Sequence, residues 1–203
     1  MNVALWTPAH SHMRYETARG VINTIDLFGR LGIPVSHQVL AHESLLSRAR
    51  NTIAAEFLRS FADILISIDA DIVFEAQDVL NLLKRERAFC AAAVATSERS
   101  WPRDSNRPLT VQEDAPLAFC AIHRSAFLAM VRAREADDAY PLQYYPSFGH
   151  ACVWGFYIPF VHERRYLSDV EAFSHRLRRA GVDPCVDRSI RVGHVETVVR
   201  SDP

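Results

Sequence analysis

The sequence predicts an α/β fold with a mostly parallel central sheet flanked by helices. Short apolar runs alternate with amphipathic stretches through the first 95 residues, which is typical of successive βαβ units. Two runs, 64–68 and 88–95, are apolar at nearly every position, as expected of parallel strands covered on both faces. A chain of 203 residues with 49% hydrophobic residues can form a full core. We therefore expect a single domain over residues 1–203.

Each element follows from its own pattern. Residues 2–6 form a short apolar run that stops at a predicted turn, Thr7–Pro8. Apolar side chains at helical spacing predict a helix over 15–31, which ends near Gly32. Further strands are expected at 33–40, 64–68, 88–95, 117–122, 182–186 and 190–192, and further helices at 44–61, 78–86, 125–135 and 169–180. Residues 97–114 are polar and predict a loop, and 140–160 show no clear period.

Composition limits the function and the surroundings of the chain. A formal net charge of -1 provides no overall basic field, so no nucleic-acid partner is expected. The first ten residues lack a secretion signal, and no run approaches the ~20 apolar residues of a transmembrane segment. Four widely spaced cysteines predict neither a zinc site nor a disulfide framework. We expect a soluble, cytoplasmic protein, and peripheral membrane association stays compatible with the sequence.

The triplet Asp69–Ala70–Asp71 ends the apolar run ADILISIDADIVF. Two carboxylates at the mouth of a buried strand repel each other unless a cation lies between them. Carboxylate oxygens suit Mg²⁺ or Mn²⁺, and these ions accompany phosphate-bearing ligands. The alternative is structural, with Asp71 or Glu75 capping the helix that follows.

A second group of candidates lies in LLSRARN, just before the strand that carries the triplet. Arg48 and Arg50 are not on one helical face, so at least one should point toward the sheet edge. With Asn51, such an arginine can clamp a nucleotide or its diphosphate beside the two aspartates. The alternative is an exposed helix with ion pairs to Glu43 or Glu56.

Two late residues complete the candidates. His194 follows Gly193 at the end of a short predicted strand, where an imidazole can add a nitrogen ligand to a metal site or remain a partly buried histidine. Asp169 opens a predicted helix and can take a proton from an attacking hydroxyl. Helix capping by Ser168 or Asp169 is the alternative.

The order of SRARN, LISIDADIVF, LAFCAIHRSAF, YLSDVEAFSHRLRRAG and DRSIRVGHVE resembles nucleotide-sugar-dependent glycosyltransferases with the GT-A, Rossmann-like fold, close to glycosyltransferase family 2. The resemblance covers nearly the whole chain. It implies a Mn²⁺ or Mg²⁺ cofactor, a UDP- or GDP-sugar donor, and a glycan or other hydroxyl acceptor.

The resemblance also implies roles for individual residues. Asp69 and Asp71 would hold the metal against the diphosphate, and His194 would complete the metal site. Thr7–Pro8 would meet the base and ribose, and Arg50–Asn51 would lie beside the nucleotide. Asp169 would be the catalytic base of an inverting enzyme. Where many relatives have a second acid, this chain has Val170, so inverting chemistry depends on Asp169 alone.

Other functions remain as alternatives. A sugar nucleotidyltransferase normally has a Gly-rich phosphate loop after its first strand, and TPAHSHMRYETARG has only Gly20. A phosphohydrolase with an Asp nucleophile would place its Asp-x-Asp after the first strand. A nucleotide-sugar-binding module or a degenerate transferase is the non-catalytic alternative. For a transferase, the aromatic side chains of Trp101, Tyr144, Tyr145 and Trp154 are candidates for stacking on sugar rings, with core packing as the alternative.

Overall fold

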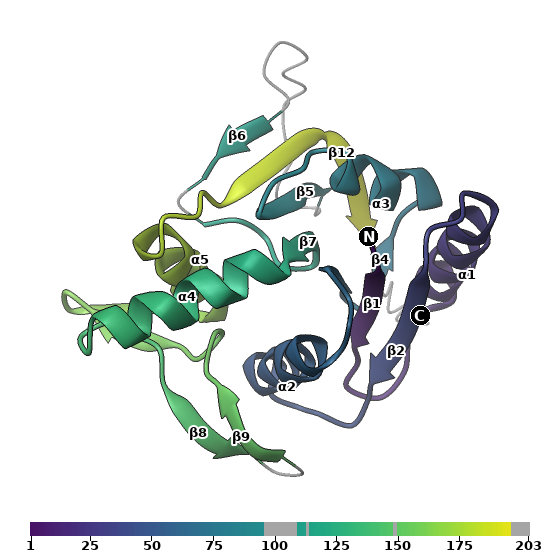
Figure 1. Cartoon of the computed structure of the whole chain (residues 1–203). Coiled ribbons are helices and arrows are strands. Elements are labelled where there is room, and N and C mark those ends of the chain that lie inside the picture. Colours follow the sequence, from purple (N-terminus) through teal and green to yellow (C-terminus); the bar gives the residue numbers. More distant parts are fainter. Residues whose placement is uncertain (96–108, 113, 148–149, 196–203) are drawn as a thin grey trace, which may run out of the picture.

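A computed structural model describes residues 1–95, 109–112, 114–147 and 150–195 (Figure 1). The main sheet has the order β2-β1-β3-β7-β5-β12-β4, with β6 paired to β12. Its strands are β1 (Val3–Pro8), β2 (Val35–Leu40), β3 (Ile64–Ile68), β4 (Ile72–Val73), β5 (Phe89–Ala95), β6 (Leu109–Val111), β7 (Phe119–His123) and β12 (Cys185–His194). The helices are α1 (Tyr15–Arg30), α2 (Leu46–Arg59), α3 (Ala76–Leu83), α4 (Arg124–Ala136) and α5 (Asp169–Arg179).

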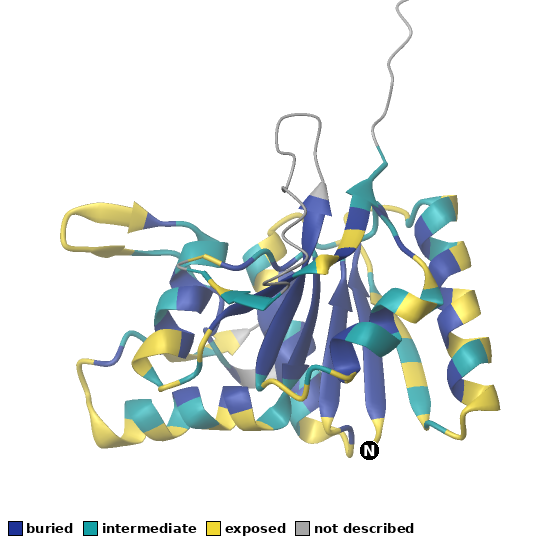
Figure 2. Cartoon of the chain, turned by 90° about the horizontal axis from the view of Figure 1, so that it is seen from above, coloured by how far each residue is buried: buried dark blue, intermediate teal, exposed yellow. Residues whose placement is uncertain are grey.

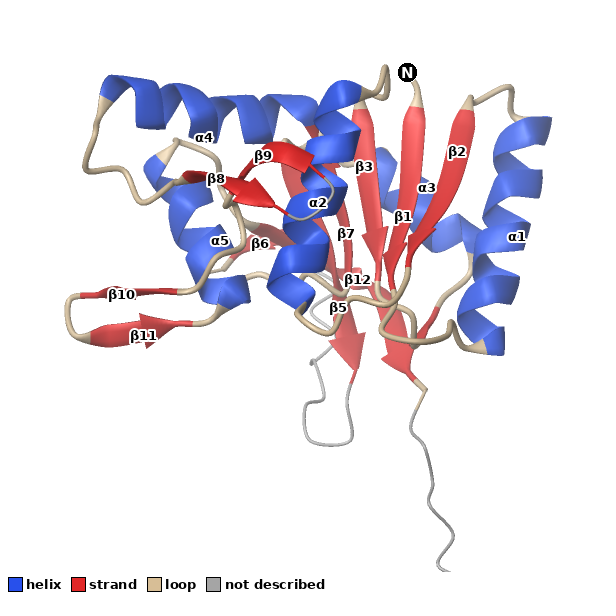
Figure 3. Cartoon of the chain, turned by 90° about the horizontal axis from the view of Figure 1, so that it is seen from below, coloured by secondary structure: helices blue, strands red, loops and turns tan. Residues whose placement is uncertain are grey.

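The sheet is mixed, but most of its strands run in one direction. Strand β1 is parallel to β2 and β3, whereas β7 lies antiparallel between β3 and β5, and β12 is parallel to β5. Strands β1, β2, β3, β5 and β12 therefore end at the same edge of the sheet (Figure 3). The predicted α/β fold is confirmed, and this carboxyl edge is where ligands bind in such sheets.

Helices cover both faces of the sheet, and each face has its own hydrophobic core (Figure 2). Alternate side chains of β1 divide between them, because successive residues of a strand point to opposite faces. Ala4 and Trp6 belong to the core under α2, α4 and α5, whereas Val3 and Leu5 belong to the core under α1 and α3. Among the described residues, no helix is long and apolar enough to cross a bilayer.

Two hairpins stand apart from the main sheet. One pairs β8 (Tyr144–Ser147) with β9 (His150–Trp154), and the other pairs β10 (Phe160–His162) with β11 (Arg165–Leu167). The buried guanidinium of Arg176, on α5, donates hydrogen bonds to the carbonyl oxygens of Pro141, Phe156 and Ile158. The Arg176 side chain therefore fixes the segment between α4 and α5 to the core by binding its backbone carbonyl groups.

Several predicted boundaries are wrong. Thr7 and Pro8 are the last residues of β1 and not a turn, because β2 extends beside them to Leu40. The two late strands form one strand, β12, with an irregularity between Asp187 and Arg191. Part of the predicted loop 97–114 is strand β6, and the segment 140–160 contains a hairpin. Most of that loop, including Trp101, lies outside the described residues.

Candidate functional site

Arg50 lies at the centre of the candidate site, between two carboxylates. Its Nη2 donates to both carboxylate oxygens of Asp69, at 3.1 and 3.0 Å, and its Nη1 donates to Oδ2 of Asp169 at 2.6 Å. The Arg50 side chain is only 5% exposed. One guanidinium thus joins Asp69, which directly follows β3, to Asp169, the first residue of α5.

The surroundings set the charge of this group. Burial alone would lower the pKa of Arg50, but the carboxylates of Asp69 and Asp169 outweigh it, so the pKa is raised and Arg50 stays charged. Burial also raises the pKa of Asp69, and the nearby charge of Asp71 adds to this, whereas Arg50 lowers it. The net shift of the Asp69 pKa is upward, so Arg50 offsets only part of the cost of placing this carboxylate at the end of a buried strand.

The Asp169 side chain does not cap its own helix. Ser168 is the N-cap of α5, and its hydroxyl accepts a hydrogen bond from the backbone N–H of Glu171. The Glu171 carboxylate in turn accepts from the Ser168 N–H at 2.8 Å, which completes a capping box. Because the box satisfies the helix end, the Asp169 carboxylate can face Arg50. Among the described residues, no donor contacts its Oδ1.

Asp71 and His194 form a second pair beside the first. Strand β4 pairs with the end of β12, so that His194 lies opposite Ile72, and the Val195 N–H donates to the Asp71 carbonyl. Nδ1 of His194 is 3.5 Å from Oδ2 of Asp71, and both side chains are partly exposed. Asp71 does not cap the helix that follows it, because Glu75, the other capping residue that the sequence offered, is the N-cap of α3.

Asp69, Asp71 and His194, predicted as metal ligands, do not form a closed metal centre. Within the described part of the chain, no group of three or more His, Cys, Asp or Glu side chains is close enough to hold a metal ion. Both oxygens of Asp69 accept hydrogen bonds from Arg50, which leaves Asp71 and His194 as an open pair. A metal bound there would need further ligands from a substrate or water.

Two adjacent cavities open around these groups. One, of about 290 Å³, is lined by Arg50, Asp69, Asp169 and His194 together with Leu46 and Leu117. The other, of about 310 Å³, is lined by Pro8, His10, Ser11, His12 and Arg14 together with Leu46 and residues 69–71. Leu46 and Asp69 belong to both walls, so the cavities meet at the triplet.

The other predicted residues are placed differently. Pro8 lines the second cavity, whereas Thr7 is buried, and its hydroxyl has no partner among the described residues. Arg48 is exposed and pairs with Glu43, as the alternative interpretation expected. Both polar atoms of the Asn51 amide are hydrogen-bonded within the protein. Its Nδ2 donates to the Tyr145 hydroxyl, and its Oδ1 accepts from the Tyr157 N–H.

His10, His12 and Arg14 line a cavity and were not among the predicted site residues. They follow the carboxyl end of β1, where the rule that selected Thr7–Pro8 would also have placed them. The backbone N–H of Arg14 donates to the Ala70 carbonyl at 2.8 Å, and the Thr17 hydroxyl also donates to this carbonyl. The start of α1 therefore fixes the turn that presents Asp69 and Asp71.

Comparisons with known proteins give only distant likenesses. No protein-family model matches the chain, and no curated protein matches it. The chain is similar to the crystal structure of a glycosyltransferase involved in the glycosylation of the major capsid of PBCV-1, with a TM-score of 0.38, 8% identity, and 74% of this chain and 73% of that one covered. It is also similar to S. aureus TarS 1-349, with a TM-score of 0.44 and 10% identity.

The second comparison covers 93% of this chain but only 58% of the TarS chain. The first of these structures is described as a glycosyltransferase, and both similarities concern the fold alone. At these scores they carry no information about the site, so the function has to be argued from the residues of this chain.

Proposed function

We propose that this chain is a glycosyltransferase that moves a sugar from a nucleotide diphosphate sugar to a hydroxyl acceptor. The observation that supports this best is the ion-paired triad Asp69–Arg50–Asp169 in the wall of the first cavity, which shares Asp69 and Leu46 with the second. It brings a buried cation and two acids to the carboxyl edge of the sheet, where a donor and an acceptor would have to meet.

The second cavity is our candidate for the nucleotide. Its wall carries His10, His12 and Arg14, whose side chains suit a base, a ribose and phosphates. The triplet Asp69–Ala70–Asp71 forms its floor, so a diphosphate there would lie against Asp71 and next to Arg50. UDP- and GDP-sugars are the proposed donors, as the sequence resemblance implies.

Asp71 and His194 fit a divalent cation by their chemistry. One carboxylate oxygen and one imidazole nitrogen, both partly exposed, suit Mn²⁺ better than Mg²⁺, which prefers oxygen ligands. Oxygen atoms of the diphosphate and water would supply the remaining ligands. When bound, the ion would supply positive charge next to the departing diphosphate. Asp69 would act indirectly, by holding the Arg50 guanidinium in place. Arg50 donates hydrogen bonds to both carboxylate oxygens of Asp69.

Asp169 is the proposed base for the acceptor hydroxyl. Its Oδ2 is fixed by Arg50, and its carboxylate lines the first cavity beside Val170. A hydroxyl within hydrogen-bonding distance of Oδ1 could pass its proton to Asp169 as it attacks the anomeric carbon. The main task of the protein is then to align the hydroxyl with the donor sugar.

Thermal unfolding with nucleotide diphosphates and their sugars, with and without Mn²⁺, tests the proposal. A ligand that binds only the folded chain raises the unfolding midpoint. We expect UDP or GDP to raise the midpoint in the presence of Mn²⁺, and the corresponding sugar donor to be consumed when acceptors are supplied. Adenosine diphosphate serves as the control nucleotide.

The outcomes separate the proposal from its alternatives. Mn²⁺-dependent nucleotide binding without turnover on any acceptor would indicate the binding module or degenerate transferase. Synthesis of a nucleotide sugar from a sugar phosphate would indicate a nucleotidyltransferase. If no nucleotide diphosphate raises the midpoint, the proposed donor site is wrong.

A further inference from the structure

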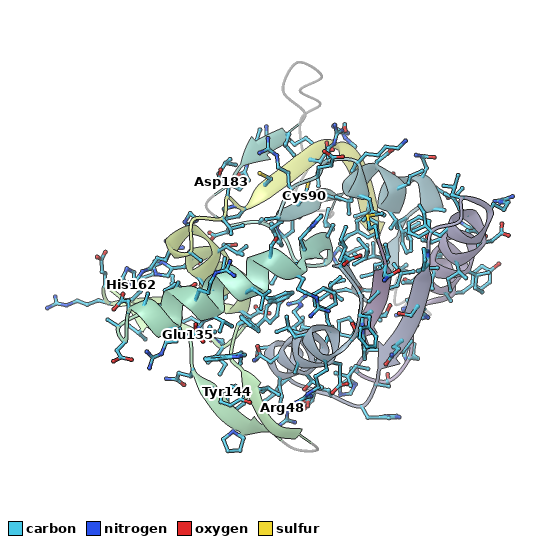
Figure 4. The ribbon with its side chains drawn as sticks, viewed as in Figure 1. Arg48, Cys90, Glu135, Tyr144, His162 and Asp183 are labelled. Carbon is cyan, nitrogen blue, oxygen red and sulfur yellow. The ribbon has the colours of Figure 1, made fainter. Side chains whose placement is uncertain are left out.

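A groove of about 760 Å³ lies between the C-terminal end of α4 and the β8–β9 hairpin. Its volume is more than twice that of either cavity at the carboxyl edge, and it lies within the range of ligand-binding pockets. Figure 4 labels Tyr144 and Glu135, which contribute to its two walls, and Arg48 on the adjacent helix. The proposed donor and base sites lie outside this groove, but Tyr144, Tyr145 and Trp154, which the sequence offered for stacking on sugar rings, all line it.

One wall of the groove is aromatic. Tyr144 on β8 and Trp154 on β9 are directly opposite each other, with ring centroids 4.8 Å apart and planes inclined by 45°. The Tyr144 ring is 58% exposed, whereas Trp154 is partly buried and packs against the core. An exposed ring with a polar edge, supported by a second ring, presents flat apolar surface to a partner that is itself partly polar. The C–H faces of sugar rings have this character.

The facing wall is polar but weakly charged. Arg134, in the last turn of α4, forms an ion pair with Asp138, which follows the helix. Glu135 also lines this wall. One cation and two anions provide no positive field for a nucleic acid or an acidic membrane surface. Guanidinium donors and carboxylate acceptors instead suit the hydroxyl groups of a neutral sugar.

The groove is anchored to α2, the helix that carries Arg50. Tyr145, which also lines the groove, accepts a hydrogen bond from Nδ2 of Asn51 at 3.1 Å. Asn51 is buried and directly follows Arg50 on α2. The hairpin is therefore held in place before any ligand arrives, which lowers the entropic cost of binding.

We propose that this groove binds a neutral glycan, with Tyr144 and Trp154 as the stacking platform. The glycan would be the part of the acceptor that lies away from the reacting hydroxyl. That identification as an acceptor rests on the proposed function, whereas glycan binding itself does not require any transfer.

Calorimetric titration of the full chain with neutral hexasaccharides, without donor or metal, tests the proposal. The panel contains oligomers of glucose, N-acetylglucosamine, mannose, galactose and rhamnose. We expect at least one to bind, and Tyr144→Ala to weaken its Kd by about tenfold, the effect of losing one aromatic stacking contact. Tyr144→Phe keeps the ring and should bind as the wild type does. Tyr166→Ala, at an equally exposed tyrosine of β11, is the matched control.

The results separate the two proposals. If the chain binds a glycan in a way that depends on Tyr144 but binds no nucleotide, the groove is a glycan site and the glycan is not an acceptor for transfer. Equal hexasaccharide affinity in the wild type and Tyr144→Ala would overturn the proposal that this groove binds a glycan. A panel in which no hexasaccharide binds would also overturn it. Self-association that Tyr144→Ala abolishes, measured by sedimentation, would assign the surface to a second copy of the chain and also overturn it.

Discussion

Residues 1–95 and residues 109–195 contribute to the candidate site in different ways. The first region is regular, and its site residues lie at strand ends or on the helix between two parallel strands, as Asp69, Asp71 and Arg50 do. The second region contains antiparallel strands and two hairpins, and it positions Asp169 with a capping box and His194 with a two-residue strand pairing. We expect the first region, with His194 from the second, to bind the donor. Asp169 of the second region acts on the acceptor, and Arg50 joins it to Asp69.

The largest effect should come from replacing Arg50, the residue that both regions share. In Arg50→Met, Asp69 and Asp169 lose their common cation, so we expect the free energy of unfolding to fall by about 3 kcal/mol. This is the low end for a broken buried ion pair, because both carboxylates keep some exposure. Transfer should be lost as well. Urea denaturation and a donor-consumption assay measure the two effects.

Arg48→Met is the matched control, since Arg48 lies two residues away but is exposed and pairs only with Glu43 among the contacts described. It should leave the free energy of unfolding close to that of the wild type. Arg50→Lys keeps the charge but not the planar fork that reaches both carboxylates, so it should fall between the two variants. Equal stability of Arg50→Met and Arg48→Met would refute the bridging role.

The next effect concerns the second region alone. Asp169→Asn retains an oxygen that can accept from Arg50 but loses the proton acceptor, so donor affinity should stay within about twofold and transfer should fall by about 10²- to 10⁴-fold. Titration with the nucleotide and initial-rate measurements separate the two quantities. Wild-type turnover in this variant would mean that another group is the base, or that the enzyme retains stereochemistry.

How far the sequence predicts this site depends on the kind of contact. Spacing along a helix shows that Arg48 and Arg50 point in different directions, but the rotation of α2 decides which one faces the sheet. That rotation is set by tertiary packing of Ile53 and Phe57 in the core. By contrast, the role of Ser168 as the cap was readable from the Ser-x-x-Glu pattern that ends at Glu171, and this pattern would have released Asp169 from capping.

The fold shows the same division. The apolar runs of β3 and β5 were identified from the sequence, but the insertion of β7 between them was not, because periodicity carries no information about pairing partners. The β10–β11 hairpin turns at Glu163 and Arg164, which both have positive φ, at 47° and 66°. Glycine and asparagine are the usual residues at such positions, so no turn signal marks this hairpin.

Two further variants test metal and donor binding alone, without an expected change in stability. Asp71→Ala should abolish Mn²⁺-dependent donor binding and leave the fold intact, because the Asp71 contact with Val195 uses its backbone carbonyl. His194→Ala should weaken Mn²⁺ affinity at least tenfold while leaving metal-free nucleotide binding unchanged. Asp26→Ala, at an exposed aspartate of α1, is the control. Unchanged Mn²⁺ titrations in both Asp71→Ala and His194→Ala would show that these two side chains do not bind the metal.

The smallest effect is a pH dependence that His175 contributes in the second region. His175 on α5 packs edge-on against Phe160 and next to His162 of the β10–β11 hairpin. Its pKa is lowered from 6.5 to about 4, first by burial and then by the positive charges of His162, Arg178, Arg179 and Arg176. As the pH falls from 6.5 toward 4, the unfolded chain gains a proton at His175 that the folded chain does not. The free energy of unfolding therefore decreases over this range.

His175→Gln removes this titration, so the loss of thermal stability between pH 7 and pH 5 should be smaller than in the wild type. Melting curves at the two pH values, recorded for both proteins, measure the difference. His10→Gln, at an exposed histidine of the first region, should keep the wild-type dependence. If His175→Gln loses as much stability as the wild type does, the acid sensitivity arises elsewhere, and the burial of the imidazole under the hairpin costs nothing at low pH.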